Sequence, residues 1–240
     1  MAKRRSTAPK AQAAQTEKDP EVKIENALGQ TEAWIEKNWK PVSYVLMAAL
    51  VVAAAVYAYE GLYRAPRSQR AADAMFVAEQ HFIAGDWATA LNGDGVNSGF
   101  VDLVADFGGT SQGRLAAHYA GIAFLKEGDL DNALTYLSKY RPSRGIPNAV
   151  VNAQNEGLRG DVYVQKGDYA AAVGHFRKAV DAADNILTTP LYLRKLGLAL
   201  EATGDYAGAL AAYKRVSEDY PASLEARDIT KLAAEAEQKL

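Results

Sequence analysis

The chain has 240 residues, of which 49% are hydrophobic and 23% are charged, as in an ordinary folded protein. Its formal net charge of −2 gives no sign of the basic surface of nucleic-acid-binding proteins, so we expect no nucleic-acid partner. Cysteine is absent, which excludes disulfides, thiol nucleophiles and cysteine-ligated metals, and abundant alanine favours helices over strands.

The N-terminal segment, residues 1–20, contains no aromatic and almost no large apolar residue. Such a segment buries too little surface to offset the entropy lost on ordering, so we expect a disordered basic arm. Residues 21–40 have apolar side chains at helical spacing and predict an amphipathic helix, which lies at a membrane surface or simply leads into the next segment. These side chains are Ile24, Leu28, Thr31, Trp34, Ile35 and Trp39.

Residues 41–60 predict a transmembrane helix. The stretch from Val42 to Tyr59 has no charged residue, and at about 1.5 Å per residue it is about as long as a bilayer core is thick. Tryptophan and tyrosine residues stand near both ends, as interfacial aromatics do. A buried core helix is rarely so apolar, and a cleaved signal peptide has a shorter leader than the 40 residues found here.

The orientation of this helix follows from the cations around it. Three basic residues flank each side, but the N-terminal arm adds more, which favours a cytoplasmic N-terminus and an external C-terminal domain. Within the span, small residues recur four positions apart and either let another transmembrane helix approach closely or merely fill an apolar span. The two pairs are Ala49 with Ala53 and Ala54 with Ala58.

The C-terminal part repeats itself. Gly-Asp pairs begin at Gly85, Gly128, Gly167 and Gly204, at spacings of 43, 39 and 37 residues. The glycine permits the left-handed backbone that ends one helix, and the aspartate caps the next helix. Each pair therefore predicts the turn of a helical hairpin.

Residue size also repeats around these turns. A small residue stands seven positions before each glycine and another five positions after it, and in the last three repeats a large residue follows four positions later. Two helices approach closely only where both lack bulk, and the large side chain fills the remaining gap. The earlier small residues are Ala78, Gly121, Gly160 and Gly197, the later ones are Ala90, Ala133, Ala172 and Ala209, and the large ones are Leu137, Phe176 and Tyr213.

This pattern resembles the tetratricopeptide repeat family over about residues 71–223. The resemblance implies a solenoid of helical hairpins, the domain of residues 61–240, and with the predicted span the chain has an all-α fold in which a single N-terminal transmembrane helix precedes this solenoid. We place the repeats at 71–104, 114–147, 153–186 and 190–223, followed by an amphipathic capping helix at 224–240.

No stretch of the chain predicts catalysis or metal binding. Residues 92–99, NGDGVNSG, resemble the start of a calcium loop, but Val96 and Leu103 occupy later ligand positions, and the segment favours a turn that interrupts the first repeat. The histidines, His81, His118 and His175, lie in different repeats and are expected to pack or to line a groove. We therefore expect no enzyme activity, no cofactor and no small-molecule substrate.

The resemblance implies a partner-binding groove formed by the first helix of each repeat. Residues at the usual groove positions are mixed apolar and polar, and none is the lysine or asparagine that clamps acidic peptide C-termini in the family. They predict an apolar groove with a few polar anchors, although packing against a long neighbouring loop is an alternative. The positions are Leu115, His118, Ile122, Leu125, Gln154, Gly157, Asp161, Val164, Leu191, Arg194, Leu198 and Glu201.

The order of the parts resembles the ancillary subunit family of the bacterial SecYEG translocon (YfgM-like). This resemblance implies an inner-membrane protein with a cytoplasmic N-terminus and a periplasmic repeat domain. Its partners would be translocon subunits, a periplasmic chaperone or exported client chains. The alternatives are a holdase chaperone that binds unfolded clients directly and a structural scaffold of another envelope assembly.

Overall fold

The computed structural model describes residues 20–143 and 145–240, so almost all of the predicted arm, residues 1–20, lies outside the described residues. The chain divides into two compact units, Met1–Tyr63 and Arg64–Leu240.

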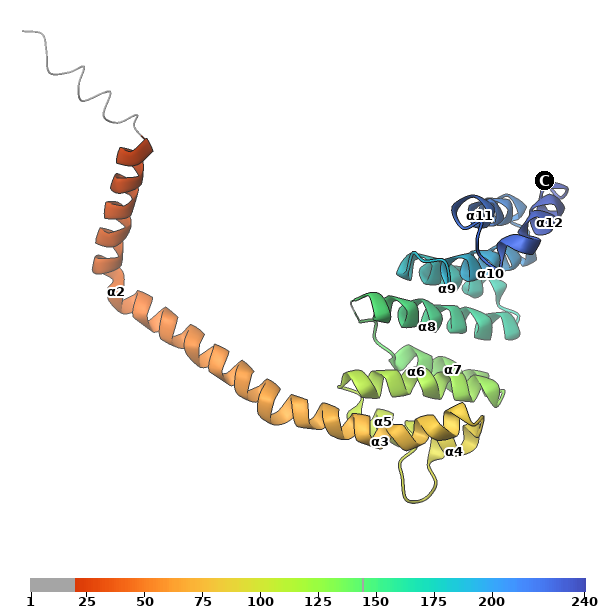
Figure 1. The fold of residues 1–240 in the computed structure, drawn as a ribbon, viewed down its shortest axis with the longest axis horizontal. Helices are drawn as coiled ribbons and strands as arrows, with labels where there is room; N and C mark the ends of the chain where they lie inside the picture. Colours follow the sequence, from red (N-terminus) through yellow and green to blue (C-terminus); the bar gives the residue numbers. More distant parts are fainter. Residues whose placement is uncertain (1–19, 144) are drawn as a thin grey trace, which may run out of the picture. The chain divides into compact units, whose positions relative to one another are not determined.

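Most of the described part of the first unit is one bent helix, α2 (Pro20–Ala58). Its backbone departs from helical geometry at Asn38, where φ is −115° and ψ is 19°. Pro41 causes the bend, because proline has no N–H to donate to the carbonyl of Lys37 and its ring collides with that carbonyl. The predicted segments 21–40 and 41–60 are therefore the two arms of a single helix (Figure 1).

The second arm of α2 is apolar and uncovered. Every residue from Tyr44 to Tyr63 is exposed, and by length and composition this is the helix, among the described residues, that is able to cross a membrane. The chain continues through a π-helix, η1 (Tyr59–Arg64), in which the rings of Tyr59 and Tyr63 stack with centroids 5.5 Å apart. The sequence analysis did not predict this π-helix.

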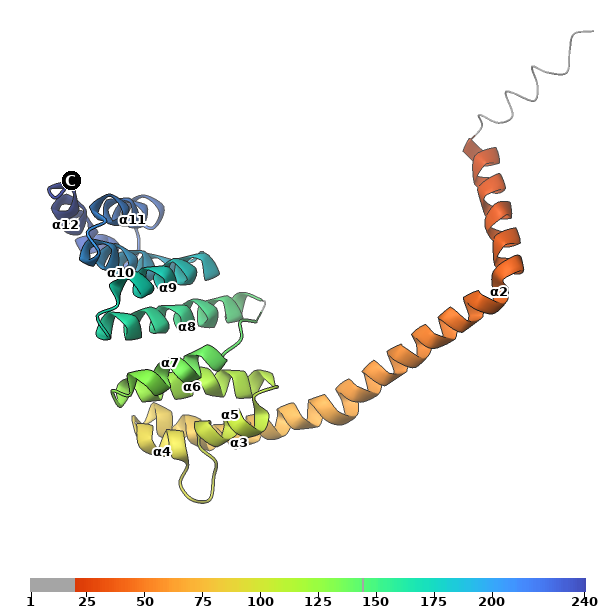
Figure 2. The same cartoon turned by 180° about the vertical axis from the view of Figure 1, so that it is seen from behind.

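The second unit is a stack of helices, in which each pair packs on the next (Figures 1 and 2). The described residues of both units form helices and no strand, which confirms the all-α prediction. The helices are α3 (Ala65–Ile83), α4 (Trp87–Asn92), α5 (Phe100–Phe107), α6 (Ser111–Lys126), α7 (Leu130–Lys139), α8 (Ile146–Gln165), α9 (Tyr169–Ala182), α10 (Thr189–Ala202), α11 (Tyr206–Asp219) and α12 (Ala226–Glu237).

The Gly-Asp pairs form the hairpin turns, as predicted. Gly85, Gly128, Gly167 and Gly204 have φ values of 79°, 80°, 76° and 82°, in the left-handed region. In each turn the aspartate side chain accepts a hydrogen bond from the backbone N–H three residues later, at 3.2, 3.0, 3.0 and 2.8 Å in chain order. The carboxylate thereby satisfies one of the free N–H groups at the start of the second helix.

The small and large residues of the last three hairpins interlock. A Cβ atom on Gly121 would lie 2.5 Å from the Leu137 side chain, and a Cβ on Gly160 would lie 2.5 Å from the Phe176 ring. At Gly197 it would overlap with the Tyr213 ring. At each of these glycines, the large side chain of the second helix fills the space that a Cβ atom would need. The prediction of close helix crossings is therefore confirmed.

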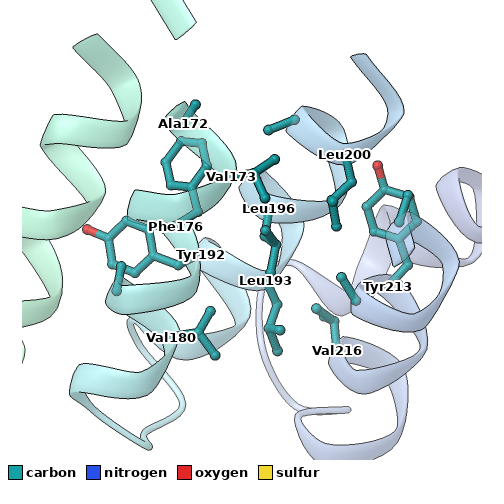
Figure 3. Close-up of a cluster of buried hydrophobic side chains, with 14 of the residues drawn as sticks. Ala172, Val173, Phe176, Val180, Tyr192, Leu193, Leu196, Leu200, Tyr213 and Val216 are labelled. Carbon is teal, nitrogen blue, oxygen red and sulfur yellow. The ribbon is translucent and has the colours of Figure 1, made fainter. Parts of the chain in front are cut away.

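The buried core runs from hairpin to hairpin. Figure 3 shows that side chains of α10, among them Leu193 and Leu196, lie between Phe176 of α9 and Tyr213 of α11. At the C-terminal end, α12 covers the last hairpin with Ile229 and Ala236, both of which are fully buried. The last helix therefore caps the array, as repeat proteins require.

The first repeat is interrupted where NGDGVNSG predicts a turn. Helix α4 ends at Asn92, and α5 begins at Phe100. Between them, the backbone and side chain of Asn97 and the backbone N–H of Val96 donate hydrogen bonds to Asp94, which lowers the pKa of Asp94 to about 2. The Asp94 carboxylate thus holds the loop through local hydrogen bonds.

Candidate partner-binding site

A small pocket opens between the third and fourth hairpins. Its volume is about 140 Å³, which is below the roughly 300–1,000 Å³ of pockets that enclose drug-sized ligands. A space of this size accommodates one or two side chains of a protein partner. It is lined by Asp161 and Val164 of α8, Tyr169 and Phe176 of α9, and Lys195, Leu198 and Ala199 of α10.

An ion pair bridges the two first helices that flank the pocket. The Nζ atom of Lys195 lies 2.8 Å from Oδ1 and 2.7 Å from Oδ2 of Asp161. Both side chains remain partly exposed, at 30% and 27%, so the pair contributes little to the free energy of unfolding. Its charges remain within reach of polar groups on a partner.

The rest of the lining is apolar and partly uncovered. Phe176 is 1% exposed, whereas Leu198 and Tyr169 are 41% and 39% exposed. Leu198 and Tyr169 would lose this exposure in contact with a partner, which stabilises a complex by about 25 cal/mol per Å² of apolar surface removed from water. The pocket therefore combines an apolar interior with two charged groups.

Two of the predicted groove residues lie beneath aromatic side chains. Gly157 is covered by the ring of Tyr192, which leaves no room for a Cβ atom. Burial, with the neighbouring Asp161 carboxylate, raises the pKa of Tyr192. His118 is only 2% exposed and lies 5.6 Å from the Tyr140 ring, centroid to centroid. Neither residue is open to a partner.

His118 instead connects the second and third hairpins. Its Nδ1 atom lies 3.2 Å from the side-chain nitrogen of Asn155 on α8, and Asn155 is itself buried. Burial lowers the pKa of His118 to about 4. The ring is therefore neutral at pH 7 and accepts a hydrogen bond from the Asn155 amide.

Glu201 connects the last hairpin to the C-terminal end. Its carboxylate accepts a hydrogen bond from the Tyr213 hydroxyl at 2.8 Å and lies 3.2 Å from Nζ of Lys239. Burial, together with the bond to Glu201, raises the pKa of Tyr213. Glu201 thus stabilises the packing of α10, α11 and the segment after α12.

The other predicted groove residues lie outside the pocket. Leu115 lines a separate hollow of about 230 Å³ that Tyr140 and Val151 also line. Leu125 packs against the buried residues Ala133, Leu137 and Val162, and Leu191 packs against the core of the last two hairpins. Gln154 is exposed, whereas Ile122 and Arg194 are half-buried.

The described residues of the chain leave the small residues of the span uncovered. Ala49, Ala53, Ala54 and Ala58 are all exposed on the second arm of α2. The two remaining histidines pair with carboxylates: Nδ1 of His81 lies 3.3 Å from Asp86, and Nδ1 of His175 lies 2.8 Å from Glu156. Within residues 20–143 and 145–240, no group of three or more histidine, aspartate or glutamate side chains is arranged to hold a metal ion.

The sequence analysis missed Tyr169, Phe176, Lys195 and Ala199 as lining residues. A signal for Lys195 was present, because it lies about one helical turn before Leu198, the residue equivalent to Asp161 at the 37-residue spacing of the last two Gly-Asp turns, and carries the opposite charge. Since equivalent positions of adjacent repeats lie side by side, a long side chain one turn from the equivalent position reaches the Asp161 carboxylate. The contribution of α9 to the pocket had no such signal.

Comparison with known proteins agrees with this fold. Residues 158–223 match the model of a tetratricopeptide repeat family. The crystal structure of the MamA protein is similar to this chain with a TM-score of 0.51 and 16% sequence identity, over 70% of this chain and 87% of MamA. A second MamA crystal structure gives a TM-score of 0.49 at 16% identity, over 68% of this chain and 95% of that chain.

Comparison with curated protein sequences gave no match. The MamA likeness, at 16% identity, concerns the fold alone. With the hairpin turns, the interlocked glycines and the family match to the last two hairpins, it establishes the architecture: this chain is a tetratricopeptide-type helical solenoid preceded by one long apolar helix.

Proposed function

We propose that this protein is a membrane-anchored adaptor whose repeat domain binds an apolar segment of a protein partner in the pocket between α8 and α10. The pocket carries the proposal: an apolar space of about 140 Å³ beside the Asp161–Lys195 ion pair. An apolar side chain of the partner would enter between Val164 and Leu198. Polar groups of the partner backbone would reach the ion pair at the rim.

The anchor in this proposal is the second arm of α2. Its side chains are exposed and apolar, and their removal from water into a bilayer is strongly favourable. The excess of cations before the span favours a cytoplasmic N-terminus and a periplasmic repeat domain at the bacterial inner membrane. The alanine pairs, Ala49–Ala53 and Ala54–Ala58, would contact a transmembrane helix of the partner complex.

The partner we propose is the protein-export machinery. The order of an anchor, repeats and a cap resembles that of the ancillary translocon subunits, and a pocket for one apolar side chain suits a chaperone or an exported chain. Site-specific photo-crosslinking tests this directly. A photoreactive amino acid replaces Leu198 in the pocket and Ala54 in the span, each in native membranes, and Leu187 serves as the control because it is 73% exposed in a loop outside the pocket.

The proposal predicts translocon subunits crosslinked at position 54, and a chaperone or exported chain at position 198 but not at 187. Unfolded chains alone at position 198, with no machinery at either site, would support a holdase. Recovery of only other envelope proteins would retain the anchored adaptor and contradict the export role. Equal products at 187 and 198 would contradict the pocket.

A further inference from the structure

The bend in α2 forms a hollow on one face of the helix. Its volume is about 470 Å³, and side chains of both arms line it. Trp34 and Asn38 come from the first arm, and the second arm contributes Pro41, Val42, Val45 and Leu46. We call this hollow the α2 notch.

The polarity of the α2 notch changes along the helix. Trp34 and Asn38 present an indole N–H and an amide, groups that are typical of the membrane interface. Val45 and Leu46, about two turns beyond Asn38, are 69% and 60% exposed. This order, from polar to apolar, matches the order of headgroup, glycerol and acyl chain in a phospholipid.

The bend is suited to an apolar environment, because nearby side chains bond the backbone around it. The side-chain nitrogen of Asn38 donates to the Trp34 carbonyl at 2.8 Å, and the Ser43 hydroxyl donates to the Lys40 carbonyl at 2.8 Å. Where water is scarce, these bonds keep the Asn38 and Ser43 side chains paired on both sides of the bend. Pro41 fixes the position of the bend at the start of the apolar span.

Two cations stand at the bend. Lys37 and Lys40 are exposed on either side of Asn38, and each has a long flexible stem that lets the ammonium group reach a phosphate. Trp39 between them is 60% exposed, as expected of a side chain that anchors at the interface. With the exposed carboxylate of Glu36 beside Lys37, the three charged side chains carry a net charge of +1, which is complementary to the phosphate of a phospholipid headgroup.

We infer that the α2 notch binds a phospholipid, and that the bend turns the first arm of α2, residues 20–38, into the plane of the membrane. The acyl chain lies along Val42, Val45 and Leu46, and the phosphate lies near Lys37 and Lys40. The inference rests on the proposed membrane anchor. It adds a second membrane contact, made by the first arm of α2, and it places one phospholipid in the α2 notch.

Spin labels test this inference in the full-length chain. The natural sequence has no cysteine, so a single introduced cysteine takes one label without further changes. The chain is reconstituted in nanodiscs of phosphatidylcholine with phosphatidylglycerol. Lipid-soluble oxygen and a water-soluble nickel chelate report the depth of each label. The sites are Ile24→Cys and Leu28→Cys on the predicted apolar face, Asn26→Cys and Gln30→Cys on the polar face, Val45→Cys in the notch and Leu50→Cys in the span.

We expect the labels at 24 and 28 to lie at interfacial depth, about 5–10 Å below the headgroups, and those at 26 and 30 to face water. The label at 45 should be relaxed by oxygen and protected from nickel. Pro41→Ala should restore a straight helix, so that the labels at 24 and 28 become at least fivefold more accessible to nickel while the label at 50 keeps its depth. Pro66→Ala, at the first turn of α3, is the matched control and should change none of these values.

Three outcomes would count against the inference. Equal nickel accessibility at 24, 26, 28 and 30, with a deep label at 50, would show that the first arm leaves the membrane although the anchor holds. A label at 45 that is shielded from both reagents would show that protein fills the notch. A label at 50 that is open to nickel would contradict the proposed anchor itself.

Discussion

At the scale of single residues, the fold depends on matched sizes in neighbouring helices. Glycine at 121, 160 and 197 faces Leu137, Phe176 and Tyr213, so each of the last three hairpins has one position without a side chain opposite one large residue. The sequence was sufficient to predict these pairs because they recur at fixed distances from the Gly-Asp turns. The first hairpin lacks such a pair, since Asp94 stands at the position of the large residue.

Adding one methyl group tests this matching. Gly197→Ala would place a Cβ atom in steric overlap with a ring carbon of Tyr213, so this fully buried side chain, whose hydroxyl is bonded to Glu201, would have to shift. We expect Gly197→Ala to lower the free energy of unfolding by about 1–3 kcal/mol. Urea unfolding of the full-length chain in detergent measures the effect.

Gly174→Ala is the matched control, because a Cβ atom on this exposed helical glycine of α9 would meet no other atom within 4 Å. It should raise the free energy of unfolding by roughly 0.5–1 kcal/mol, since alanine loses less backbone entropy than glycine. Equal effects of the two substitutions would contradict the proposed packing.

His118 makes stability depend on pH. Burial lowers its pKa from 6.5 to about 4, so the unfolded chain binds a proton more readily than the folded chain. The stabilising contribution of the neutral ring is fully present above pH 6.5 and is lost as the pH falls toward 4, by up to roughly 3 kcal/mol. His118→Gln keeps an acceptor for Asn155 without titrating. The free energy of unfolding of the natural protein, relative to that of His118→Gln, should therefore fall as the pH falls from 6.5 toward 4. A difference that does not depend on pH would contradict the burial of the ring.

At the scale of elements, the sequence was sufficient to predict most helices and their turns, but it predicted the contacts between helices only in part. Hairpin turns are local, so Gly-Asp spacing locates them. The bend in α2 also has a local cause in Pro41, yet the sequence analysis placed two helices there. His118 and Gly157 occupy groove positions in the family pattern, but Tyr140 and Tyr192 cover them, and such coverage depends on how neighbouring repeats pack.

The capping helix provides a test at this scale. Ile229 of α12 is fully buried against the last hairpin, whereas Leu224, just before α12, is 74% exposed. Ile229→Asp would bury an unpaired charge and should cost about 3 kcal/mol or more. Relative to the natural protein, this variant should show a larger increase in the rate of amide hydrogen exchange in α11 and α12 than in α6 and α7, because repeats transmit stability only to their neighbours. Leu224→Asp should leave exchange unchanged, and an equal response to both would contradict the capping role.

At the scale of the whole molecule, the chain joins an apolar helix to a repeat domain with a small apolar pocket. The order of these parts followed from composition and periodicity, because both are properties of long segments. The pocket could not be predicted in this way, since residues of three helices form it, together with an ion pair between residues 34 positions apart. The proposed function rests on this pocket, where Asp161, Val164 and Leu198 of the predicted groove come together.

The most direct test of the adaptor function is partner capture with and without an intact pocket. A photoreactive amino acid at Tyr169, on the pocket rim, reports partner occupancy in native membranes. The account predicts that Leu198→Asp lowers the crosslinked yield at least tenfold, which corresponds to about 1.4 kcal/mol of binding free energy, while Leu187→Asp, outside the pocket, leaves it unchanged. An undiminished yield with Leu198→Asp, in a protein whose helical content and unfolding are unaltered, would contradict the pocket as the partner site.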